Sequence, residues 1–196
     1  MLDYKDERTT MNYIEQIKNY IPYNEQEKVD KDFALKHIEE SSNILTRDDE
    51  LAHITASSWI VNKEHTKILL IYHNIYKSWS WTGGHADGEE NLLHVAIKEA
   101  MEETGIEKFT PVSEDIFSIE NLCVNGHIKR GKYISSHLHI NVSYLLEADD
   151  KAPLKIKEDE NAGVKWFTLE EALIVPNEEW MVENIYKKLN EKLSKI

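Results

Sequence analysis

Three glutamates are the residues of this sequence best suited to chemistry. They lie within residues 83–106, which read GGHADGEENLLHVAIKEAMEETGI, and the second half of this segment is predicted to be a helix. Glu99, Glu102 and Glu103 stand near its end, where like charges repel one another and oppose the helix dipole. A divalent cation would remove this repulsion, and Mg²⁺ in proteins is bound by carboxylates, waters and substrate phosphates. The spacing therefore favours a metal site over a solvated acidic surface.

The pattern of the predicted helix places these carboxylates at the edge of its buried side. An apolar stripe covers the first two turns, and the glutamates stand one heptad further on. We expect the helix to begin near Gly88, because Asp87 and Glu90 have the spacing of a capping box. Gly105 is expected to end it in the left-handed conformation. The stripe consists of Leu92, Val95 and Ala96.

Composition and charge limit the class of protein. The 196 residues are 41% apolar and 30% charged, as in a soluble globular protein, and no apolar run approaches the roughly 18 residues of a membrane span. The net charge of −13 argues against non-specific nucleic-acid binding. The charged N-terminus does not resemble a secretory signal. The single cysteine, Cys123, is expected to be buried and fits a reducing cytosol, so we expect a cytoplasmic protein without membrane association.

The hydrophobic pattern predicts an α/β (α+β) fold in which a mixed sheet lies between helices. Residues 135–148 alternate apolar and polar side chains, which predicts a half-buried strand with His137, His139, Asn141 and Ser143 toward solvent. Thr168 and Glu171 are expected to cap a helix that follows a short strand. The other expected strands are 53–62, 67–74, 111–125 and the start of 162–174, and the other expected helices are 11–20, 24–41 and 178–194.

The glycine loop and the acidic helix together resemble the Nudix box, G-x5-E-x7-R-E-U-x-E-E-x-G-U, where U is a bulky aliphatic residue. The matching positions are Gly84, Glu90, Glu99, Glu102, Glu103, Gly105 and Ile106. Lys98 replaces the arginine of the box, and Ala100 stands at an aliphatic position. The likeness extends from about residue 53 to residue 174. We therefore expect an N-terminal helical extension over 1–50, a Nudix domain over 51–175 and a C-terminal helix over 176–196 packed on the domain.

The resemblance implies hydrolysis of a nucleoside diphosphate linked to another moiety, with Mg²⁺ or Mn²⁺ as the cofactor. It implies that Glu99, Glu102 and Glu103 hold the metal together with the backbone carbonyl of Gly83. Glu160 lies where some members carry an acid that completes the metal site or acts as the base, and an ordinary exposed acid is the alternative. In the family pattern, Gly84, Glu90, Gly105 and the residue at position 98 shape the loop and helix. There the arginine pairs with the glutamate that corresponds to Glu90, and Lys98 either keeps this pair or is a solvated lysine.

Four further side chains are candidates for contact with the substrate. His85 lies in the glycine loop, and Trp81 precedes it. His137 and His139 share one face of a predicted strand and could contact phosphate or a second metal ion, although a polar strand face usually faces solvent. Stacking on a base is one role for Trp81, and core packing is the alternative.

Three functions remain open at this stage. The first is a metal-dependent pyrophosphohydrolase of small nucleotide-type diphosphates, and the second is a Nudix-fold binding or regulatory module without hydrolysis. The third is the isoprenoid diphosphate isomerase branch, which relies on a catalytic cysteine, but Cys123 lies outside any matching motif. The intact set of glutamates favours the first. A homodimer is among the assemblies we expect, and the substrate is not predicted.

Overall fold

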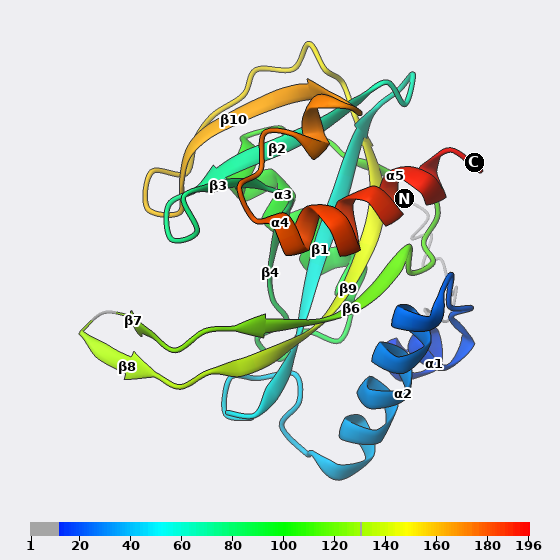
Figure 1. The fold of residues 1–196 in the computed structure, drawn as a ribbon, viewed down its shortest axis with the longest axis vertical. Helices are drawn as coiled ribbons and strands as arrows, with labels where there is room; N and C mark the ends of the chain where they lie inside the picture. Colours follow the sequence, from blue (N-terminus) through cyan, green and yellow to red (C-terminus); the bar gives the residue numbers. More distant parts are fainter. Residues whose placement is uncertain (1–11, 130) are drawn as a thin grey trace, which may run out of the picture.

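The computed structural model describes residues 12–129 and 131–196, and among them eight strands form one mixed sheet (Figure 1). Strands β1 (Ala52–Asn62) and β9 (His137–Ala148) run parallel at its centre, and their neighbours pair antiparallel to them. The strand order is β10-β2-β1-β9-β5. In addition, β3 pairs with β2, β4 pairs with β1 and β6 pairs with β9. This confirms the expected common sheet of 53–62 and 137–147. The other strands are β2 (Lys67–His73), β3 (Ser78–Ser80), β4 (Thr82–His85), β5 (Thr110–Pro111), β6 (Ser118–Val124) and β10 (Asn161–Thr168).

The two central strands are buried on both faces over most of their length. The prediction of a half-buried strand at 135–148 is therefore wrong, since Asn141 and Ser143 are fully buried. Their polarity is accommodated by hydrogen bonds: the hydroxyls of Thr55 and Ser57 on β1 donate to Oδ1 of Asn141 at 3.0 and 2.7 Å. Such pairing removes most of the cost of burying a polar group.

Helices cover both faces of the sheet, which confirms the expected mixed α+β fold. Helix α3 (Leu92–Thr104) packs on one face, and the C-terminal segments α4 (Glu179–Met181), η2 (Val182–Tyr186) and α5 (Lys187–Leu193) pack on the other. The η2 segment is a wider π-helical turn. No helix in the described ranges is long and apolar enough to cross a lipid bilayer.

The start of one predicted helix needs correction. Helix α3 begins at Leu92, and its cap is Asn91, whose side chain accepts from the N–H of His94 at 3.0 Å. Asp87 cannot cap a helix there because its φ of 47° places it in a left-handed turn. The end at Gly105, with φ of 72°, is confirmed. Within the expected helix 178–194, Trp180 is 53% exposed, whereas Ile185, Leu189 and Leu193 are buried in the core.

Two helices precede the sheet. They are α1 (Tyr13–Asn19) and α2 (Glu25–Glu40), and asparagine side chains cap both. Ile21 follows the end of α1 and is 86% exposed, and Met11, the first residue of the expected helix 11–20, lies outside the described residues. Helix α2 packs on β6, where Nδ2 of Asn121 donates to the backbone oxygen and Oδ1 of Asp30 at 3.2 and 3.1 Å. The division of the chain at residues 50 and 175 stays a prediction.

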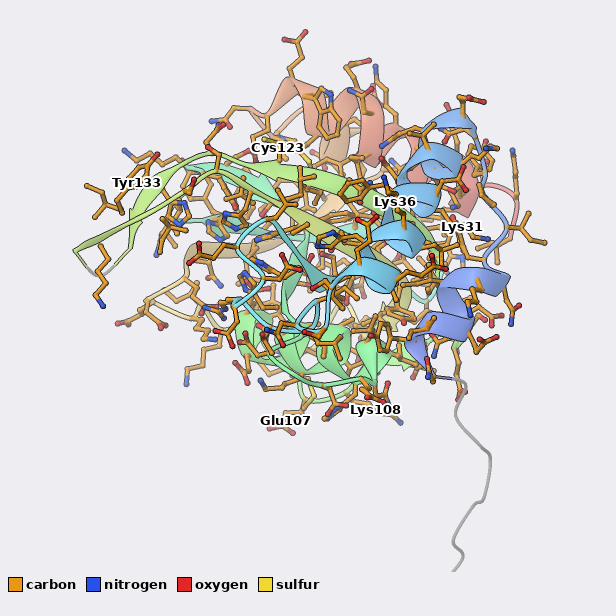
Figure 2. The ribbon with its side chains drawn as sticks, turned by 90° about the horizontal axis from the view of Figure 1, so that it is seen from below. Lys31, Lys36, Glu107, Lys108, Cys123 and Tyr133 are labelled. Atoms are coloured by element: carbon orange, nitrogen blue, oxygen red, sulfur yellow. The ribbon has the colours of Figure 1, made fainter. Side chains whose placement is uncertain are left out.

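The segments around β6 and β10 follow the predictions in part. Within 111–125 only Pro111 and residues 118–124 are in strands, and Cys123 is exposed, so the prediction of a buried cysteine is wrong. Beyond β6, strands β7 (His127–Lys129) and β8 (Lys132–Ile134) form an arm that projects from the body and carries Tyr133 (Figure 2). After β10, Thr168 and Glu171 form the expected capping box, although it opens only a single 3₁₀ turn, η1 (Glu171–Leu173).

Candidate active site

The three glutamates lie along the last turns of α3, beside strand β4. Glu103 is almost fully buried and accepts a hydrogen bond from the backbone N–H of Gly83 at 2.9 Å. The Glu99 side chain is 16% exposed, and that of Glu102 is 41% exposed. A Cβ on Gly84 would lie 2.5 Å from Cδ of Glu99, so glycine is needed for this approach. The helix thus carries the carboxylates at the edge of its buried side.

Burial and mutual repulsion disfavour ionisation of two of these groups. Burial raises the pKa of Glu103 to about 8 in spite of the hydrogen bond from Gly83, and repulsion from Glu99 and Glu160 adds to the rise. Burial also raises the pKa of Glu99, as does its repulsion from Glu102. Carboxylates that ionise with difficulty gain most from a nearby cation, and such shifts are typical of functional sites.

A lysine that sequence reasoning missed links the fourth acid to this group. Nζ of Lys157 lies 2.9 Å from Oε2 of Glu102 and 3.0 Å from Oε2 of Glu160. Burial alone would lower the pKa of Lys157, but the hydrogen bonds to the two carboxylates outweigh it and raise this pKa. The bond from Lys157 in turn lowers the pKa of Glu102. The structure therefore brings Glu160 to the glutamates of α3.

Lys98 does not pair with Glu90 as the box arginine would. Among the described residues, its ion pairs run to Glu99 at 3.8 Å and to Glu102 at 3.7 Å. The spacing of four residues places Lys98 beside Glu102 on the same helix, whereas Glu90 lies in the loop before the helix begins. Lys98 thus adds positive charge to the acidic group, and of the two alternatives left open for it, the pair with Glu90 is not the one that the structure shows.

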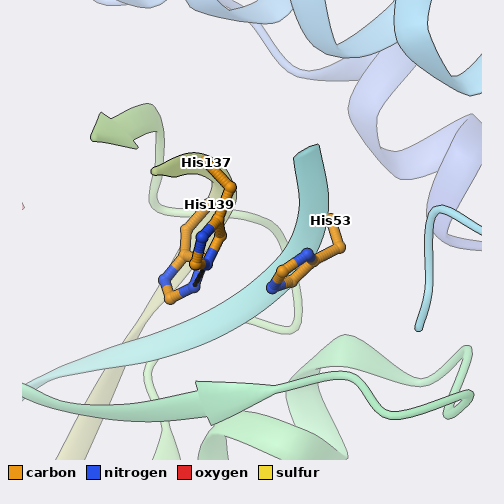
Figure 3. A group of neighbouring side chains, drawn as sticks. All are labelled: His53, His137 and His139. Carbon is orange, nitrogen blue, oxygen red and sulfur yellow. Dashed lines mark hydrogen bonds between the residues drawn. The ribbon is translucent and has the colours of Figure 1, made fainter. Parts of the chain in front are cut away.

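The predicted histidines gather beside β4, together with one that sequence reasoning missed. His137 and His139 on β9 face His53 on β1 (Figure 3). The ring of His85 on β4 lies 5.2 Å from that of His53 and 4.8 Å from that of His139, between centroids. Burial lowers the pKa of His53 and lowers that of His139 to about 2, helped at His139 by the neighbouring His85. Both rings are therefore neutral at pH 7.

Trp81 is a core residue and not a platform for the substrate. It is only 9% exposed, and its ring packs edge-on against Tyr186 with centroids 5.8 Å apart. Both rings belong to the core between the sheet and the C-terminal helix. The hypothesis that Trp81 stacks on a base is therefore wrong, because helix residues cover the ring.

A mixed sheet between helices, with a glycine-bearing strand held against an acidic helix, has the features that the sequence resemblance implied. A family model described as NUDIX domain matches residues 51–189, which is more than half of the chain. The chain therefore belongs to the NUDIX family. The prediction of a Nudix-type pyrophosphohydrolase is confirmed at the level of this family.

Similar proteins agree with this assignment. A probable DHNTP pyrophosphohydrolase of Lactococcus lactis subsp. cremoris (strain MG1363) is 30% identical over 157 residues, covering 80% of this chain and 87% of the relative. A NUDIX-family hydrolase from Clostridium perfringens has a TM-score of 0.54 at 24% identity, covering 73% of this chain and 97% of that one. The E. coli dihydroneopterin triphosphate pyrophosphohydrolase has a TM-score of 0.52 at 12% identity, covering 69% and 92%. The two structures show a common fold.

Proposed function

We propose that this protein is a divalent-metal-dependent hydrolase of the phosphoanhydride bond in a small nucleotide-type substrate. The observation that carries the proposal is the buried carboxylate of Glu103, held by the N–H of Gly83 and crowded by Glu99 and Glu160. Carboxylate oxygens of this kind, partly desolvated along one side of a helix, fit Mg²⁺ or Mn²⁺. Nudix hydrolases generally use divalent metal ions, in agreement with this donor set.

In this proposal the acidic residues bind the metal and the lysines supply positive charge. Glu99, Glu102 and Glu103 would hold the metal, with the backbone carbonyl of Gly83 as a further oxygen donor. A metal bound there supplies charge neutralisation for the diphosphate and a water of lowered pKa. Glu160, whose carboxylate lies across Lys157 from Glu102, would complete the metal site or accept the proton of the attacking water. Lys157 and Lys98 bring the cationic charge that an anionic substrate needs in a chain with a net charge of −13.

The substrate is best sought with a panel. It should contain ADP-ribose, dinucleoside polyphosphates, NADH and nucleoside triphosphates, and also dihydroneopterin triphosphate because the Lactococcus relative is named for DHNTP. We expect phosphate or pyrophosphate release from at least one compound, loss of this activity in excess EDTA, and recovery with Mg²⁺ or Mn²⁺. The variant Glu103→Gln should lower the rate by orders of magnitude.

Two results would contradict the proposal. Full turnover in excess chelator would exclude a requirement for a divalent metal ion. An unchanged rate in Glu103→Gln would show that the metal site does not include Glu103. If no compound is cleaved while Mg²⁺ binds, the module without hydrolysis is the better assignment. A cytoplasmic location and a homodimer belong to the same proposal, and light scattering on the purified protein tests the dimer.

A further inference from the structure

A second group of ligating side chains lies apart from the glutamates. One ring nitrogen each of His53, His137 and His139 lies within 4.8 Å of the other two (Figure 3). Among the residues that the structure describes, no other three histidine, cysteine or acidic side chains are gathered so closely. Nε2 of His137 and Nε2 of His139 are 3.2 Å apart. Two nitrogens that share a tetrahedral ion at 2.0–2.1 Å are about 3.3 Å apart, so this pair already has the spacing of ligands.

Backbone carbonyls orient two of these rings for binding. Nδ1 of His53 lies 2.9 Å from the backbone oxygen of Asp49, and Nδ1 of His137 lies 2.8 Å from that of Ser135. A carbonyl oxygen only accepts, so Nδ1 carries the hydrogen in both rings and donates it. The lone pair is then on Nε2. Metal-binding histidines are oriented by outer hydrogen bonds of this type.

A hydrogen-bonded histidine pair explains only part of this arrangement. Nε2 of His139 could donate to Nε2 of His137, which would satisfy both rings. That pair would leave out His53, a residue that is 4% exposed and whose Nε2 has no hydrogen-bond partner among the described residues. A buried acceptor without a partner costs stability. A cation between the three rings would satisfy it.

We propose that His53, His137 and His139 bind a late first-row divalent cation, of which Zn²⁺ and Co²⁺ are examples. Neutral imidazole is the ligand that such ions prefer, whereas Mg²⁺ prefers oxygen. The ring of His85 packs against those of His53 and His139 and closes the group on the side of β4. Three protein ligands leave a coordination position open for water or a substrate oxygen.

Strand β4 keeps this site separate from the glutamates. Gly84 faces Glu99, as the 2.5 Å approach of a Cβ to Cδ of Glu99 shows. His85 is the next residue of the strand, and successive side chains of a strand point to opposite faces. Its partner in the register is Thr55, on the same face of β1 as His53. The histidine site and the oxygen site thus lie on two sides of one strand, and the proposal does not depend on hydrolysis.

The test uses the full chain without a histidine tag and Co²⁺ as the probe. Cobalt bound by imidazoles in four- or five-coordinate geometry absorbs strongly in the visible, whereas cobalt in an octahedral oxygen site absorbs weakly. We expect strong absorption that saturates at one equivalent of Co²⁺ and is displaced by Zn²⁺. His137→Ala should weaken Co²⁺ binding by at least about tenfold, because even the loss of an outer partner of a metal ligand costs roughly 10–100-fold.

Matched variants separate this site from its surroundings. His94→Ala removes an exposed imidazole on α3 and should leave the spectrum unchanged. Glu102→Gln should also leave it unchanged, since that carboxylate belongs to the oxygen site. His53→Gln and His139→Gln should both remove the strong absorption, and near-UV circular dichroism checks that they stay folded. If either variant does not fold, the Co²⁺ spectra of His137→Gln and His137→Ala are the test, because His137 is half-buried and its substitution disturbs the core less.

Three results would overturn the proposal. The first is a tag-free protein that shows no strong visible absorption with Co²⁺. The second is a spectrum that survives substitution of His137. The third is a spectrum that Glu102→Gln abolishes, which would assign the bound cobalt to the carboxylates.

Discussion

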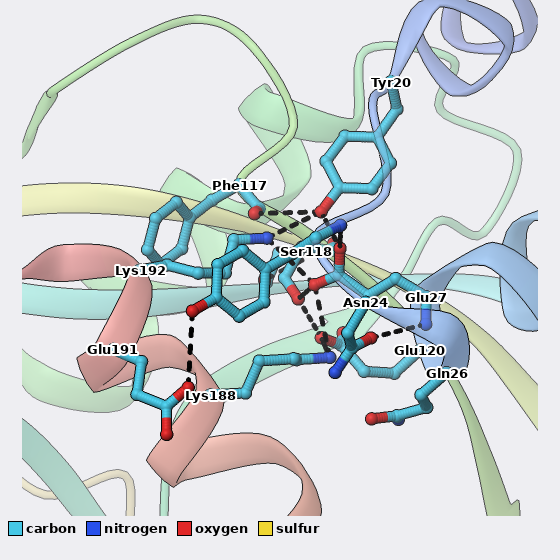
Figure 4. A network of polar contacts seen from close by, with 12 residues as sticks. Tyr20, Asn24, Gln26, Glu27, Phe117, Ser118, Glu120, Lys188, Glu191 and Lys192 are labelled. Atoms are coloured by element: carbon cyan, nitrogen blue, oxygen red, sulfur yellow. Dashed lines mark hydrogen bonds and ion pairs between the residues drawn. The ribbon is translucent and has the colours of Figure 1, made fainter. Parts of the chain in front are cut away.

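Nζ of Lys192 lies 2.9 Å from Oε1 of Glu27 and thereby joins the last helix of the chain to the second (Figure 4). Glu27 is fully buried, Nζ of Lys188 lies 3.3 Å from the same oxygen, and the hydroxyl of Ser118 donates to it at 2.7 Å. The N–H of Tyr23 donates to the other oxygen at 2.7 Å. The partners come from several segments far apart in the sequence, so this carboxylate fixes α2 to the rest of the molecule.

Replacing Glu27 by Gln should lower the free energy of unfolding by about 3–5 kcal/mol, because Lys192 loses its carboxylate partner in this buried network and Lys188 keeps only Glu120, at 3.0 Å. Urea denaturation measures this. Lys28→Met is the matched control: it breaks an exposed pair with Asp32 on the same helix and should change the free energy by less than about 1 kcal/mol. Equal effects of the two variants would show that the buried pair does not hold α2 in place.

The pH dependence of stability should report Glu103. Its pKa of about 8 in the folded protein lies above the ordinary value of 4.5, so between these values the folded state binds more protons than the unfolded state. The free energy of unfolding should therefore fall as the pH rises from about 4.5 to 8, by about 2–4 kcal/mol in EDTA.

Glu103→Gln should remove most of this fall, because the amide oxygen still accepts the N–H of Gly83 but carries no charge. Urea denaturation of both proteins at several pH values is the measurement. Mg²⁺ should also reduce the fall in the parent protein. A variant with the same pH profile as the parent would contradict the assignment to Glu103.

Lys157→Met should tighten Mg²⁺ binding by about three- to tenfold. The ammonium group lies between Glu102 and Glu160 and repels a cation that uses the same carboxylates, and this repulsion is partly screened by solvent. Isothermal titration calorimetry measures the change. Lys151→Met, in an exposed turn outside the site, should leave the affinity unchanged. Weaker Mg²⁺ binding in Lys157→Met would mean that the lysine organises the carboxylates and does not compete with the metal.

Lys98 gives a prediction that differs from the one the Nudix box suggests. Because Lys98 pairs with Glu99 and Glu102, Lys98→Arg should not gain activity through a clamp on Glu90. Lys98→Ala should change kcat by less than about threefold and the free energy of unfolding by less than about 1 kcal/mol, since the side chain is 57% exposed. Steady-state kinetics on a cleaved substrate is the measurement. A large gain in kcat for Lys98→Arg would show that the residue at position 98 does act through a pair with Glu90.

The sequence predicts the parts of the site that depend on local spacing. Glu99, Glu102 and Glu103 share one side of a helix, and helical periodicity alone shows this. The first residue of that helix is harder to predict, because aspartate and asparagine are both good capping residues. Only the left-handed turn at Asp87 excludes Asp87 in favour of Asn91.

The partners of these residues depend on contacts that no local pattern carries. Lys157 reaches Glu102 from a loop 55 positions away, and nothing in its own segment marks it. His53 had a weak signal, since it begins an alternation of polar residues in β1 that matches the one in β9. Only the parallel register, which sets His53 opposite His139, places it beside the other histidines.

That parallel register has a consequence for how the chain folds. It pairs β1 and β9 over their whole length, and hydrogen-bonded partners in it, such as Thr55 and Asn141, are 86 positions apart. Closing so long a loop precedes any gain from the pairing, and non-local topologies of this kind fold slowly. During synthesis, His53 therefore meets His139 only after β9 has left the ribosome. Until then a newly made chain can offer the histidine site only its β1 ligand, His53.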